Sequence, residues 1–146
     1  MATRKSSAVA FIAILIAAGL VAFVTRVEAQ TIDEQKQALI GEWTGVWPGM
    51  PLWPEMSQST VTLIIHEIDT AKAKAQCTYT SSEYGEKKYP LLADFTPGAN
   101  PKLEFKVEGK DYEVILKDKV LQATFRGVAQ GMSQSNSTKM VKKPQK

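Results

Sequence analysis

The chain has one histidine, His66, and one cysteine, Cys77, so few residues could carry conventional catalysis or bind a metal. Metal sites need several His, Cys, Asp or Glu side chains at short spacings, and the sequence shows no such cluster. A serine nucleophile would need His66 as its base, and no Gly-x-Ser-x-Gly elbow is present. On a strand, His66 and Glu67 would point to opposite faces and could not act together. We therefore expect no catalytic residues, no metal site and no cofactor, with His66 on the surface or rim.

The stretch Ala38–Met56, ALIGEWTGVWPGMPLWPEM, holds all three tryptophans of the chain: Trp43, Trp47 and Trp53. Its first half alternates like a strand, whereas prolines break its second half and predict a stiff, apolar loop over residues 47–56. A stiff apolar loop suits recognition, because little conformational entropy is lost when it binds. It could cover a ligand as a lid, plug a barrel end, or contact a partner protein or an envelope surface.

Residues 1–29 have the layout of a secretory signal peptide. Arg4 and Lys5 precede the uncharged apolar run Ala8–Val24, and Val27-Glu28-Ala29 places suitable residues before a cleavage point after Ala29. The alternative is an uncleaved membrane anchor, because the apolar run is only slightly short for a span. With cleavage we expect residues 30–146 to form one domain without a stable membrane span, exported to the periplasm or the extracellular space.

The charge and cysteine content exclude several classes of protein. The net charge is +3, and the leader contributes +2 of it, with Arg4, Lys5 and Arg26 against Glu28, so residues 30–146 carry about +1. Such a balance gives no reason to expect a nucleic-acid partner. A lone cysteine excludes an internal disulfide, and Cys77 is expected to be a buried, inert thiol. Asn136-Ser137-Thr138 is an N-glycosylation sequon, which matters only in a host that glycosylates exported proteins.

Alternating apolar and polar residues dominate residues 30–146 after a short helix near Ile32–Ala38, which Thr31-x-x-Glu34 opens as a capping box. One face of each strand is apolar; in the third strand Ala71, Ala73, Ala75, Cys77 and Tyr79 are expected to face inward. The predicted strands are Leu39–Trp47, Ser59–Ile68, Ala71–Ser81, Lys87–Phe95, Lys102–Val107, Asp111–Lys117, Val120–Gly127 and Ser137–Lys143.

Short connections between these strands imply antiparallel neighbours, and a one-sided apolar face must be buried against itself or a second sheet. Eight strands suit a barrel whose interior is filled by side chains or holds one small ligand. We therefore predict an all-β protein, an eight-stranded antiparallel up-and-down barrel preceded by a short helix. The alternative is a β-sandwich.

The start of this pattern resembles the lipocalin-like (calycin) barrels: a short helix, then Leu39-x-Gly41-x-Trp43 entering the first of eight strands. More narrowly, Gly41-x-Trp43-x-Gly45-x-Trp47 before an Ala-rich strand that ends in Tyr79 is similar to small lipocalin-like domains of exported bacterial proteins. The resemblance implies that Gly41 lets the helix cross close to the strand and that Trp43 plugs the closed end of the barrel. It also implies that a basic residue of the last strand, Lys139 or Lys142, lies over the Trp43 ring.

Three hypotheses about function follow. The first is a non-enzymatic binding protein for a small apolar ligand in or at the mouth of the barrel. The second is a structural or interaction module that presents loop 47–56 to a partner protein or envelope surface. The third is a haem-binding barrel with His66 as ligand, because LIGEWTGVWPG is loosely similar to the opening of the nitrobindin barrels. For the first hypothesis the ligand contacts are expected from Trp47, Trp53, Tyr79, Phe105, Tyr112 and Phe125.

Overall fold

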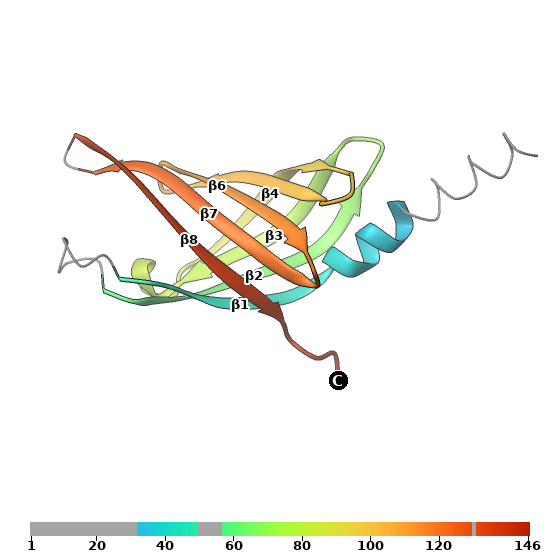
Figure 1. Cartoon of the computed structure of the whole chain (residues 1–146), viewed down its shortest axis with the longest axis horizontal. Coiled ribbons are helices and arrows are strands. Elements are labelled where there is room, and N and C mark those ends of the chain that lie inside the picture. Colours follow the sequence, from blue (N-terminus) through green and yellow to red (C-terminus); the bar gives the residue numbers. More distant parts are fainter. Residues whose placement is uncertain (1–31, 50–56, 130) are drawn as a thin grey trace, which may run out of the picture. The chain divides into compact units, whose positions relative to one another are not determined.

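A computed structural model describes residues 32–49, 57–129 and 131–146 (Figure 1). Residues 32–39 form a helix, as predicted, and strands make up most of the described chain from Gly41 to Lys142. The elements are β1 (Gly41–Trp47), β2 (Ser59–Asp69), β3 (Lys74–Ser81), the 3-10 turn η1 (Ser82–Tyr84), β4 (Lys88–Thr96), β5 (Lys102–Val107), β6 (Lys110–Lys117), β7 (Val120–Ala129) and β8 (Met132–Lys142). Residues 1–29, where we expect a leader, and the loop residues 50–56 lie outside the described part of the chain.

Each strand pairs antiparallel with the next one along the chain, and β1 also pairs with β8. The sheet is therefore a closed eight-stranded barrel, which confirms the predicted up-and-down topology and excludes the sandwich. The barrel lies within the compact unit Gln35–Lys146. No helix among the described residues is long and apolar enough to cross a membrane.

The closed end of the barrel is built around Trp43, whose ring is 1% exposed. Its indole Nε1 donates a hydrogen bond of 2.8 Å to the carbonyl of Leu39 at the end of the helix. The Lys142 ammonium lies 5.6 Å from the centre of the Trp43 ring and also donates to the carbonyls of Gln37 and Ala38, at 3.2 and 3.1 Å. One lysine thus stacks on the ring, a contact worth about 0.5–2 kcal/mol, and caps the helix C-terminus.

The buried Trp43 ring fits the expected plug, and the basic residue over it is Lys142 and not Lys139. Gly41 has φ +138°, a conformation that other residues rarely adopt, and a Cβ there would lie 2.6 Å from Lys142 Cε and would push the lysine side chain away from its place. Side chains alternate between the two faces of β8. Met140 and Lys142 share the inner face, so Lys139 lies on the outer face and is exposed. The first strand also begins two residues later than predicted, because Leu39 still belongs to the helix.

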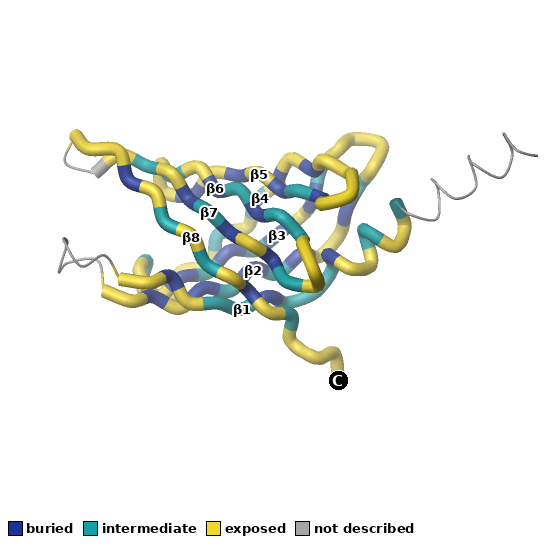
Figure 2. Tube along the Cα trace, viewed as in Figure 1, coloured by how far each residue is buried: buried dark blue, intermediate teal, exposed yellow. Residues whose placement is uncertain are grey.

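Burial alternates along the strands, with inward residues dark blue and outward residues yellow or teal in Figure 2. In β3, Ala75, Cys77 and Tyr79 are buried as predicted. Ala71 and Ala73 are exposed, so their predicted inward position is wrong. The chain turns at residues 70–73 after β2, and Ala73 has the left-handed φ of 52° that such a turn requires.

A bulge in β2 changes the faces expected for His66 and Glu67. The pairing with β3 shifts between Ile65 and Glu67, which leaves His66 as an extra residue. His66 and Glu67 are consequently both exposed, and Ile68 returns to the buried interior. The surface position predicted for His66 is confirmed, but the prediction that the two side chains point to opposite faces is wrong.

The barrel wall opens toward one end at two places. β1 pairs with β8 only at Trp43–Gly45, and β4 pairs with β5 only at Asp94–Thr96. Both paired stretches lie toward the closed end, so both pairs of strands separate toward the opposite end. We call that opposite end, where β1 finishes, η1 lies and β6 begins, the mouth of the barrel.

Replacing Trp43 with Ala should lower the free energy of unfolding by about 3–5 kcal/mol, because a large buried ring and its hydrogen bond are lost. Urea denaturation followed by far-UV circular dichroism measures this change. Val128, 73% exposed on the wall, provides the control, and Val128→Ala should stay within about 0.5 kcal/mol of wild type. A Trp43→Ala variant as stable as this control would contradict the role of Trp43 as the plug.

Candidate functional site

Five aromatic side chains gather in the barrel interior toward the mouth. Trp47 meets Phe125 edge-on at 5.1 Å between ring centres, and Tyr79 lies 5.0 Å from Tyr112. Phe105 stacks on Tyr112 at 5.2 Å with only 6° between the planes. All five side chains are at most 9% exposed. Offset and edge-on contacts at these distances stabilise the cluster beyond the burial of apolar area alone.

The strand register explains why these residues meet. Phe105 pairs with Tyr112 and Tyr112 pairs with Phe125, so three rings lie side by side on the inner face of β5, β6 and β7. Tyr79 and Trp47 approach them from β3 and β1 across the barrel. Of the six ligand contacts expected from the sequence, the structure brings these five into one cluster. The sixth, Trp53, lies outside the described residues.

A chain of polar atoms runs through this aromatic cluster. Trp47 Nε1 donates to the Tyr79 hydroxyl at 3.3 Å, and the Tyr79 hydroxyl donates to that of Tyr112 at 3.4 Å. The Tyr112 hydroxyl is also 3.4 Å from the hydroxyl of Tyr84, on η1. Hydroxyl hydrogen bonds are most often 2.7–2.8 Å long, so these contacts are loose. The array can accept a better oxygen partner without breaking strong bonds.

Burial keeps the interior groups of β3 and β6 neutral. Desolvation raises the pKa of the Cys77 thiol to about 12, which supports its predicted role as an inert buried residue. Desolvation also raises the pKa of Tyr79, against the effect of its hydrogen bonds with Tyr112 and Trp47. It raises the pKa of Tyr112 further, aided by the neighbouring Tyr79. The phenols therefore act as neutral donors and acceptors at physiological pH.

Two turns meet over the mouth. Lys110, the first residue of β6, has the same inward parity as Tyr112, and its ammonium is 2.6 Å from a carboxylate oxygen of Glu83 on η1. The ammonium also lies 4.8 Å from the centre of the Phe125 ring and 5.4 Å from that of Tyr84. The mouth thus combines one inward cation, its acidic partner and the outermost phenol of the array.

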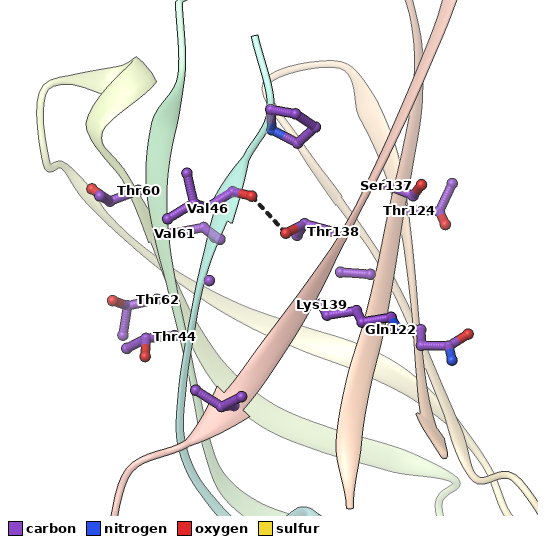
Figure 3. A pocket seen from close by; sticks show the side chains of 14 residues that line it. Thr44, Val46, Thr60, Val61, Thr62, Gln122, Thr124, Ser137, Thr138 and Lys139 are labelled. Carbon is purple, nitrogen blue, oxygen red and sulfur yellow. Dashed lines mark hydrogen bonds between the residues drawn. The ribbon is translucent and has the colours of Figure 1, made fainter. Parts of the chain in front are cut away.

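Side chains replace the missing backbone ladder at the β1–β8 seam. Thr138 Oγ1 donates to the Val46 carbonyl at 2.6 Å, drawn as a dashed line in Figure 3, and Asn136 Nδ2 donates to the Pro48 carbonyl at 2.8 Å. A groove of about 1100 Å³ runs along this seam between β1–β2 and β7–β8. The side chains of Asn136 and Thr138, both part of the sequon, are therefore engaged in holding the seam.

His66 lies outside the barrel interior. Its ring is exposed on the bulge of β2, where Nε2 lies 2.9 Å from Thr78 Oγ1. A haem group inside the barrel could not be ligated by this residue, so the third hypothesis loses its ligand. Within residues 32–49, 57–129 and 131–146, no group of three or more His, Cys, Asp or Glu side chains is placed to hold a metal.

Sequence reasoning missed Glu83, Tyr84 and Lys110, which lie in the short connections between the predicted strands. Glu83 and Lys110 are far apart along the chain and meet only because the barrel brings the β3–β4 connection over the start of β6. One signal was available for Lys110. It lies two residues before the inward Tyr112, so the alternation that predicted Tyr112 also places Lys110 on the inner face.

The free energy of unfolding should fall as the pH rises above about 9. Cys77 loses its proton near pH 9.0 in the unfolded chain and near 12 in the folded protein. Between these values the unfolded state binds fewer protons, so stability falls by up to about 1.4 kcal/mol per pH unit. The measurement is urea denaturation at several pH values, in which Cys77→Ala should show a shallower decline. An equal decline in both proteins would contradict the assignment to Cys77.

Comparisons with known proteins support the fold and no more than the fold. No family model and no curated protein matches the sequence. Among solved structures, the chain is similar to the siderocalin Ex-FABP, which functions through dual ligand specificities. The TM-score is 0.50 at 12% sequence identity, over 73% of this chain and 74% of that one. With the closed eight-stranded barrel and its Trp43 plug, this similarity shows that the chain has a lipocalin-like, calycin-type fold.

Proposed function

We propose that this protein is an exported, non-enzymatic binding protein for a small apolar ligand held in or at the mouth of its barrel. The observation that carries the proposal is the aromatic cluster of Trp47, Tyr79, Phe105, Tyr112 and Phe125, which lies directly inside the mouth. Binding sites for small molecules are typically concave and apolar, with a few polar groups that orient the ligand. The loose hydroxyl array supplies those polar groups.

Two further features support this proposal. The wall separates toward the mouth at both the β1–β8 and the β4–β5 seams, so fewer ladder hydrogen bonds hold that end than the closed end. The fold is also that of a siderocalin whose function is described by its ligand specificities. The rings already contact one another, so we expect the ligand to enter by displacing contacts at the mouth rather than by filling a space at the Trp43 end.

A neutral naphthylamine dye should bind the purified domain, residues 30–146, in a saturable way, with enhanced dye emission. Tyr112→Leu should weaken the dye about tenfold, because it removes the ring that contacts all four other members of the cluster. Trp43→Phe at the closed end is the matched control and should leave the affinity unchanged. Native mass spectrometry after incubation with a lipid extract provides a second readout.

The competing hypothesis, an interaction module, predicts the opposite result. No saturable dye binding, together with a bare protein mass after the lipid extract, would overturn the ligand-binding proposal. The search would then move to partners of loop 47–56, whose residues 50–56 lie outside the described part of the chain.

Export is the second part of the proposal and is tested separately. It rests on the charged start, apolar run and small-residue end of residues 1–29. Protein recovered from its own host should have the mass of a chain that begins at Gln30. A chain that keeps residues 1–29 and stays with the membrane fraction would show an anchor in place of a leader.

A further inference from the structure

We propose that the ligand is an amphipathic anion whose carboxylate binds Lys110 at the mouth, in the place that Glu83 occupies in this structure. This inference rests on the proposed function and names the chemical class of the ligand. Its apolar part would contact the aromatic cluster, and its carboxylate would remain at the barrel end.

The position of Lys110 is the first argument. Lysine side chains on barrels normally extend into water, but Lys110 points inward and its side chain is only 17% exposed. Gly127 on β7 makes room for it, because a Cβ there would lie 2.9 Å from Lys110 Cγ. The ammonium is consequently held above the Phe125 ring, 4.8 Å from its centre. This cation lies where an anion at the mouth would meet it.

The ion-pair partner of Lys110 also supports this proposal. The ammonium is neutralised by Glu83, a carboxylate on the short η1 turn, at 2.6 Å. The carboxylate of an amphiphile has the same chemistry as the Glu83 side chain and could take the same position. The Glu83 side chain is 33% exposed, so it can turn into water when a ligand replaces it, at a small cost of desolvation.

The hydroxyl array also has one hydrogen-bond donor more than it has contacts. Trp47 Nε1 and the hydroxyls of Tyr79, Tyr112 and Tyr84 are four donors, and three contacts link them among the described residues. One hydroxyl proton, on Tyr112 or on Tyr84, is left to donate outside the array. It lies beside Lys110, whose ammonium is 5.4 Å from the Tyr84 ring centre. An ammonium and a phenol donor side by side suit the two oxygens of one carboxylate.

Displacement of the neutral naphthylamine dye by dodecanoate and by dodecanol tests this inference, because the two chains differ only in the head group. Lys110→Met should weaken dodecanoate about tenfold, the effect of losing one hydrogen bond to a charged group, and should leave dodecanol unchanged. Lys110→Arg should restore most of the preference for dodecanoate. Glu83→Gln should strengthen dodecanoate severalfold, because it removes the internal competitor. Far-UV circular dichroism and the melting temperature establish that each variant is folded.

Gly127→Ala provides a variant that keeps every charge. The added methyl group displaces the Lys110 stem, so this variant should lose part of the preference for dodecanoate while binding dodecanol as wild type does. Equal effects of Lys110→Met on both probes, or weaker binding of dodecanoate to Glu83→Gln, would overturn the inference and leave the proposed function standing. Failure of the dye itself to bind would overturn both.

Discussion

Closure of the sheet between β1 and β8 makes the two ends of the barrel different. The two strands pair only at Trp43–Gly45, and Gly45 lies so close to β8 that a Cβ would be 2.9 Å from the Lys139 carbonyl. Beyond this point the strands separate, and the side chains of Thr138 and Asn136 donate to the carbonyls of Val46 and Pro48. A barrel without free edges therefore exists only toward the Trp43 end. The opposite end is left with fewer backbone hydrogen bonds and more side-chain contacts.

This asymmetry divides the interior into two chemically different parts. Toward the closed end the side chains are aliphatic or small around the Trp43 plug, among them Leu63, Ala75 and Leu121, all at most 1% exposed. Toward the mouth they are aromatic and carry hydroxyl and indole groups bonded to one another at long distances. Polar groups buried in an apolar barrel are costly unless they are satisfied. Their concentration near the mouth, next to an inward lysine, is what makes this end the candidate site.

The same arrangement links the site to the turns above it. Tyr84 and Glu83 on η1 contact Tyr112 and Lys110, so the β3–β4 connection rests on the start of β6 through a phenol and an ion pair. Tyr89 adds a hydrogen bond to Glu108 across the separated β4–β5 seam, and that bond raises its pKa to about 12. Side chains from different turns, more than a backbone ladder, therefore hold the mouth together. Contacts of this kind can be exchanged for contacts with a ligand without unfolding the barrel.

Alternation in the sequence predicts the strands and most of their inner faces, because a period of two leaves little freedom about which side is apolar. The plugged end was expected from the resemblance of Gly41-x-Trp43 to the start of the lipocalin-like barrels, and Trp43 is buried there. Alternation would have selected Lys142 over Lys139, because Met140 and Lys142 share one face. The sequence pattern does not predict the bulge at His66 or the turn at Ala73, since each depends on how long a neighbouring strand continues. The mouth follows from barrel closure and not from any local pattern: Glu83 and Tyr84 on η1 are distant along the chain from Lys110 at the start of β6, and barrel closure alone brings them together over the aromatic cluster.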